Sequence, residues 1–141
     1  MTFAYLLPTI LFYLFAIFSV FVCFKRGDPI DKKISVASMC AIVATTLSQD
    51  IDFNPMTPVK FLIIDTILLA FVFYCSIKSS KFWPLTLCAA LVVGIFTHIA
   101  AISILKIPTI PYLAAINIWG FVCMATIIGG VVIEKDTDQP A

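Results

Sequence analysis

The run FWPLTLCAALVVGIFTHIAAISIL, residues Phe82–Leu105, decides the class of fold because it carries no Asp, Glu, Lys or Arg. A helix of about 20 apolar residues crosses the hydrocarbon core of a bilayer, which is about 30 Å thick. This run therefore predicts a transmembrane helix, and its one histidine, His98, is predicted to lie inside the membrane.

Other apolar runs extend this prediction to the whole chain. Three of them are also long enough to span: Phe3–Phe24, Val59–Ile77 and Tyr112–Ile133. A fifth run, Ile34–Gln49, is shorter and richer in Ser, Ala and Thr. We predict an all-α, single-domain bundle over residues 1–141 with five transmembrane helices. Four spanning helices and one interfacial helix at Ile34–Gln49 are the alternative.

Composition excludes several classes of protein. Hydrophobic residues make up 62% of the 141 residues and charged residues 12%, whereas soluble domains average about 45–50% and about 25%. The net charge of +1 offers no electrostatic footprint for nucleic acid. We expect the lipid bilayer as the surrounding medium and no nucleic-acid partner.

The basic residues predict how the chain is oriented, because Lys and Arg concentrate in cytoplasmic loops. Five spans with a periplasmic N-terminus and a cytoplasmic C-terminus place seven of the nine basic residues inside and leave Lys60 and Lys106 outside. The inside set is Lys25, Arg26, Lys32, Lys33, Lys78, Lys81 and Lys135. Four spans divide the basic residues less cleanly, six against three. The pattern favours five spans, with the N-terminus outside and the C-terminus inside.

A layer of polar side chains is predicted inside the outer half of the bundle. Asp65 and His98 each lie roughly 10 Å from the outer end of their runs, at a helical rise of about 1.5 Å per residue. Asn117 and Thr45 fall at nearly the same depth. A short turn joins the third and fourth runs, so we expect Asp65 and His98 to meet across an antiparallel hairpin.

Three interpretations of this layer stay open. The polar groups can form a structural clasp between helices, a protonatable site centred on His98, or a site for a metal or small ligand. One His and one Asp are fewer ligands than zinc usually takes, and the five cysteines have no metal-binding spacing. We therefore expect no metal and no cofactor. No catalytic motif is present in the sequence, so we expect no enzyme activity.

The turn between the third and fourth runs carries candidate interface anchors. Pro84 suits the first turn of a helix, Trp83 and Trp119 are candidate anchors at the membrane surface, and Lys78 and Lys81 are expected to meet lipid phosphates.

The same motifs carry a resemblance to a known family. They are Ile64-Asp65-Thr66, the turn Ile77-Lys78-Ser79-Ser80-Lys81-Phe82-Trp83-Pro84, Thr97-His98, and Asn117-Ile118-Trp119 with Gly129. This pattern, over roughly half of the chain, resembles small polytopic inner-membrane proteins of alphaproteobacteria, notably sphingomonads. That family has Arg where this turn has Lys, and the resemblance implies relatives without an established activity.

Two functions are consistent with these observations. The first is a non-catalytic accessory or structural subunit that contacts other integral membrane subunits, or further copies of itself, through its lateral surface. The alternative is a small oligomeric transporter or channel that moves protons or ions through the polar layer.

Overall fold

The computed structural model describes residues 3–48, 56–104 and 109–137, and these residues form helices joined by turns. No strand occurs among them, so the predicted all-α class is confirmed. The helices are α1 (Phe3–Arg26), α2 (Pro29–Leu47), α3 (Thr57–Lys78), α4 (Trp83–Ser103) and α5 (Thr109–Thr137).

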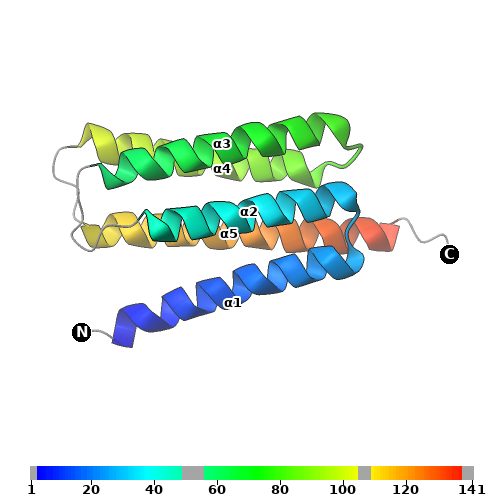
Figure 1. Ribbon diagram of the computed structural model, residues 1–141, viewed down its shortest axis with the longest axis horizontal. Helices are drawn as coiled ribbons and strands as arrows, with labels where there is room; N and C mark the ends of the chain where they lie inside the picture. Colours follow the sequence, from blue (N-terminus) through cyan, green and yellow to red (C-terminus); the bar gives the residue numbers. More distant parts are fainter. Residues whose placement is uncertain (1–2, 49–55, 105–108, 138–141) are drawn as a thin grey trace.

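The five helices lie side by side with their axes along the length of the molecule, and consecutive helices run in opposite directions (Figure 1). We call the end where α1, α3 and α5 begin the His98 end. The opposite end, where α2 and α4 begin, is the Lys81 end.

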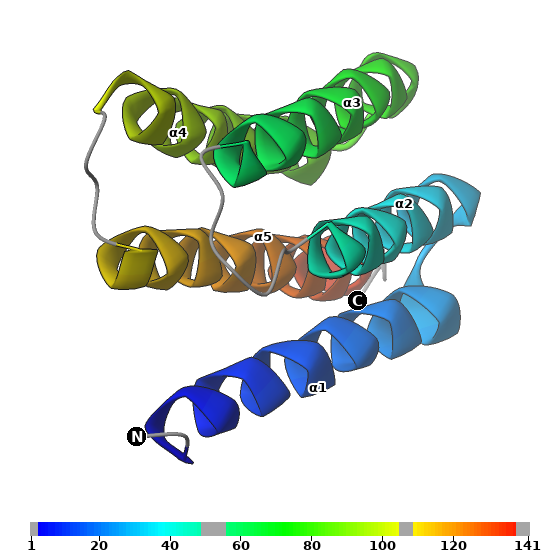
Figure 2. The ribbon, with the colours of Figure 1, turned by 60° about the vertical axis from the view of Figure 1, so that its left-hand side comes forward.

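The helices form a closed ring in which each packs against the helices before and after it in the chain (Figure 2). Packing of α1 against α5 closes the ring. Ser19 of α1 donates a hydrogen bond to the sulfur of Met124 at 3.3 Å, and the Phe12 ring meets Phe121 edge-on. Leu68, Val72, Leu87, Leu91 and Ile127 fill the centre, together with four of the cysteines.

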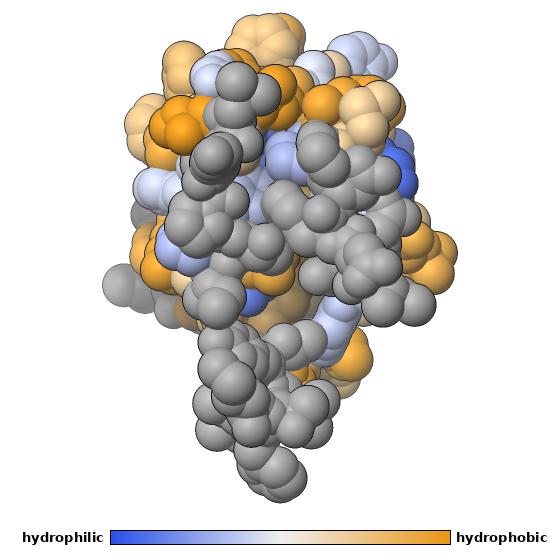
Figure 3. Space-filling view, turned by 90° about the vertical axis from the view of Figure 1, so that its left-hand side faces the viewer, coloured by the Kyte–Doolittle hydropathy of each residue, from blue (hydrophilic) through white to orange (hydrophobic). Residues whose placement is uncertain are grey.

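The outward faces of the helices are strongly apolar. Three described segments are long and apolar enough to cross a membrane: Thr57–Lys78, Trp83–Ser103 and Pro111–Glu134. At the His98 end, hydrophobic groups lie around the rim with more polar groups between them, as seen in Figure 3. Large exposed apolar patches on a protein signal contact with lipid or with another apolar surface, and the chain is a membrane-embedded helical bundle.

Helix α2 begins at Pro29, five residues before the Ile34 start of the predicted apolar run. The predicted apolar run starts later than the helix because the first turn of α2 is charged. The backbone N–H of Asp28 donates to the Asp31 carboxylate at 2.9 Å, and Pro29 occupies the first turn. Both features stabilise a helix start.

Candidate functional site: a three-helix polar clasp

His98 joins three helices near the His98 end of the bundle. Its Nε2 lies 3.0 Å from Oδ2 of Asp65 on α3, and its Nδ1 lies 2.7 Å from the hydroxyl of Tyr112 on α5. The His98 side chain is 3% exposed. Gly94, one turn before His98, faces the Asp65 carboxylate. The expected contact between Asp65 and His98 is therefore present, and Tyr112 completes the three-helix clasp.

The clasp can hold its geometry in two protonation states. With a neutral imidazole, Nε2–H donates to the Asp65 carboxylate and the Tyr112 hydroxyl donates to Nδ1. With a protonated imidazole, both ring nitrogens donate and the Tyr112 oxygen accepts. The Asp65 side chain is 26% exposed. One side of the clasp therefore reaches the protein surface while the imidazole stays inside.

Aromatic and polar side chains enclose the imidazole. The Phe61 and Tyr112 rings meet it edge-on, with centroids 6.1 and 5.8 Å away. Phe61 and Tyr112 are both buried. Hydrogen bonds in such low-dielectric surroundings are stronger than in water, and their loss is correspondingly costly.

Asn117 and Thr45 lie outside this clasp in the described part of the chain. Asn117 is partly buried on α5, and no described hydrogen bond joins it to His98 or Asp65. Thr45 lies on α2, which packs against α1 and α3 rather than against α4. The position of Asn117 and Thr45 along their helices predicted their depth in the membrane. Which side chains meet depends also on the direction in which each side chain leaves its helix.

A second polar centre lies at the Lys81 end. The Lys81 ammonium lies 2.7 Å from Asp31, 3.2 Å from Asp28 and 3.4 Å from Glu134. Asp31 is fully buried, and the Lys81 side chain is 17% exposed. One cation thus joins the α3–α4 turn to α2 and α5.

The Lys81 network contradicts the expectation that Lys81 meets lipid phosphate. Burial alone would lower the pKa of Lys81, but hydrogen bonds to Asp31 and Asp28 and the charge of Glu134 raise it above the ordinary lysine value. Lys81 is therefore an internal counter-ion. Lys78 is exposed, with its ammonium 4.5 Å from the centroid of the Tyr74 ring.

Trp83 and Trp119 were both expected at the membrane surface, and the structure places Trp83 inside the bundle. Trp83 is 6% exposed and packs where a Cβ on Gly130 of α5 would lie 2.3 Å from its Cγ. Because Gly130 has no Cβ, the Trp83 indole fits inside the ring of helices. Trp119 is partly buried well inside the apolar stretch Pro111–Glu134. Pro84 lies in the first turn of α4, as expected, and is buried.

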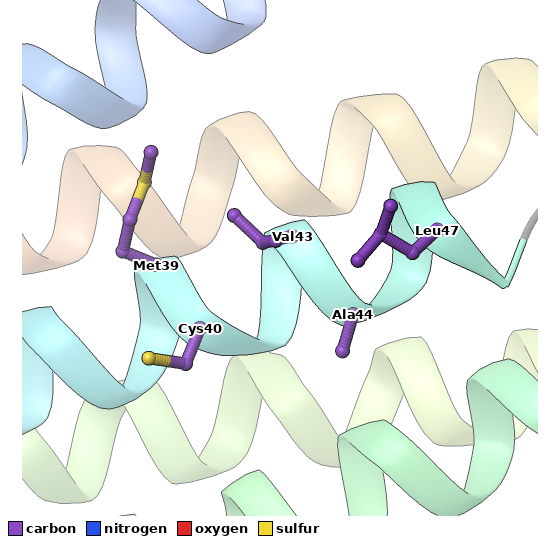
Figure 4. Close-up of a pocket in the computed structure, with 5 residues that line it drawn as sticks. All are labelled: Met39, Cys40, Val43, Ala44 and Leu47. Atoms are coloured by element: carbon purple, nitrogen blue, oxygen red, sulfur yellow. The ribbon is translucent and has the colours of Figure 1, made fainter.

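The described side chains form no metal-binding cluster, and an apolar groove lies on α2. No group of three or more His, Cys, Asp or Glu residues among them could hold a metal ion. A groove of about 350 Å³ runs along α2 and is lined by Met39, Cys40, Val43, Ala44 and Leu47 (Figure 4). Its lining is apolar, and the clasp residues lie outside it.

Comparison with protein-family models, with curated proteins and with solved structures yields no match. The geometry of the clasp and of the Lys81 network therefore carries the functional argument.

Proposed function

We propose that the chain crosses a bacterial inner membrane five times, with its N-terminus in the periplasm and the Lys81 end in the cytoplasm. The contact of Lys81 with Asp28 and Asp31 supports this topology, because it brings the α1–α2 and α3–α4 turns to the same end. Helix α2, at 19 residues, is about 28 Å long, and α1, at 24 residues, is longer still. Both lengths suit a full crossing.

Within that membrane, we propose that the protein is a non-catalytic accessory or structural subunit of a larger assembly. The observation that carries this proposal is the apolar outer surface of the bundle, with the polar clasp and the Lys81 network held inside. Polar side chains bind one another inside the ring, whereas bulky apolar residues cover its outside. On α1 the exposed set is Ile10, Leu11, Leu14, Ile17, Phe18, Phe21 and Phe24.

The connections at the Lys81 end favour partners that bind from the side. Only Gly27 and Asp28 separate α1 from α2, and residues 79–82 separate α3 from α4. Such turns offer little surface outside the bilayer. The clasp supports the same proposal, since His98 uses both ring nitrogens to hold α3, α4 and α5 together as one unit.

Purification tests the subunit proposal. We expect the tagged full chain, extracted from its native membrane in a mild detergent, to retain another integral membrane subunit at fixed stoichiometry through affinity and size-exclusion steps. An unrelated small polytopic protein of the same membrane, carrying the same tag, is the control and should not retain that subunit. A stable monomer that carries no other subunit, in several mild detergents, would contradict the proposal.

A further inference from the structure

A second groove, of about 600 Å³, opens between α2 and α3 at the Lys81 end. Lys32, Lys33, Val36 and Ala37 of α2 and Phe71 of α3 line it. Lys33, Val36 and Phe71 are exposed, and Lys32 and Ala37 are half-buried. The groove is therefore cationic at its end and apolar along the rest of its length.

The charges around this groove are unbalanced. The described carboxylates at the Lys81 end, those of Asp28, Asp31 and Glu134, all converge on the Lys81 ammonium. No described carboxylate lies within ion-pair distance of Lys32 or Lys33. Lys78 adds a third positive charge nearby, since Lys33 and Lys78 both act electrostatically on the Cys75 side chain.

We propose that this groove binds one anionic phospholipid of the cytoplasmic leaflet. Lys32 and Lys33 hold the headgroup phosphate, and one acyl chain lies along Val36, Ala37 and Phe71. The groove is cationic at the end of the bundle and apolar toward its middle. An anionic lipid in that leaflet has the same arrangement, with its charged headgroup at the membrane surface and its acyl chains toward the membrane centre. Basic pockets beside transmembrane helices on the cytoplasmic side bind such headgroups. The inference rests on the proposed membrane orientation, but not on the presence of a partner subunit.

Native mass spectrometry of the purified full chain tests the site, with phosphatidylglycerol and phosphatidylcholine supplied in the detergent. We expect one phosphatidylglycerol to be retained in preference to phosphatidylcholine. Lys32→Gln/Lys33→Gln should weaken that retention about 30-fold, from the usual contribution of two lysines at a membrane surface. The matched control Lys25→Gln/Arg26→Gln removes the same charge from α1 at the same end and should change retention less than about threefold.

Two further measurements distinguish lipid binding in the groove from a nonspecific attraction of the lipid to positive charge. Val36→Trp keeps every lysine but places an indole in the groove, so retention should fall while the helical circular dichroism stays unchanged. Glycerol phosphate should not displace the lipid, because it lacks the acyl chain. Equal losses in the two double variants, unchanged retention in Val36→Trp, or displacement by glycerol phosphate would each overturn the proposal. Failure to find a partner subunit leaves these outcomes unaffected.

Discussion

Replacing Lys81 with Met is expected to lower the free energy of unfolding by about 3 kcal/mol, the cost typical of removing one partner from a buried ion pair. Asp31 is fully buried, and its Oδ2 accepts a hydrogen bond from Lys81 at 2.7 Å. Without the ammonium, Asp31, Asp28 and Glu134 would repel one another at the end of the ring. Reversible unfolding in mixed micelles, followed by circular dichroism, measures the loss.

The other lysine of the same turn provides the control. Lys78 is exposed and contacts only the face of Tyr74 among its described partners, so Lys78→Met should lower the free energy of unfolding much less than Lys81→Met does. Equal losses at the two positions would show that the Lys81 network contributes no more than a surface charge.

The pH dependence of the same pair of proteins adds a second measurement. Because the pKa of Lys81 is raised in the folded state, its contribution is fully present below the unfolded lysine value of about 10.4 and is lost as pH rises through the folded pKa. The stability difference between wild type and Lys81→Met should therefore stay constant from about pH 7 to pH 10 and shrink only at higher pH. A difference that disappears near neutral pH would contradict this assignment.

The second large effect is expected at Gly130. A Cβ at this position would lie 2.3 Å from Cγ and 2.4 Å from Cβ of Trp83. The stem of the indole cannot rotate away, so α4 and α5 must separate. We expect Gly130→Ala to lower the free energy of unfolding by about 2 kcal/mol, within the range for overpacked cores.

The adjacent glycine is a matched control in the same helix. A Cβ at Gly129 meets nothing within 4 Å, so Gly129→Ala should leave stability unchanged or raise it by up to about 1 kcal/mol through helix propensity. The same reversible unfolding assay compares the two variants. If both alanines behave alike, Trp83 does not pack against α5 as the structure describes.

Much of the fold could be predicted from the apolar runs, because an uninterrupted apolar stretch has few alternatives to a spanning helix. Asp65 and His98 could be paired in advance, since a short turn fixes the relative depth of residues in a hairpin. The start of α2 could not, because hydropathy treats a charged first turn as a loop even when Asp31 is fully buried.

The partners of the clasp and of the Lys81 network depend on how each helix is rotated about its axis. Tyr112 is the first residue of its predicted apolar run, yet its hydroxyl contacts His98 from the neighbouring helix. Lys81 looked like a lipid contact because its acidic partners, Asp31 and Glu134, lie far away in the sequence. Gly130, whose missing side chain leaves room for Trp83, lies on α5, whereas Trp83 begins α4.

The proposed five crossings can be tested most directly by labelling single cysteines in intact cells with a membrane-impermeant maleimide. The variants are Arg26→Cys, Met56→Cys and Ser80→Cys, each made in a chain whose native cysteines are replaced. Arg26 lies just before α2, Met56 lies just before α3 and Ser80 lies just after α3, and all three positions are exposed. We expect Met56→Cys to be labelled from the periplasm, and Arg26→Cys and Ser80→Cys only after the membrane is permeabilised. Labelling of Arg26→Cys and Met56→Cys from the same side would contradict the five-span bundle, because α2 would then lie along the membrane surface.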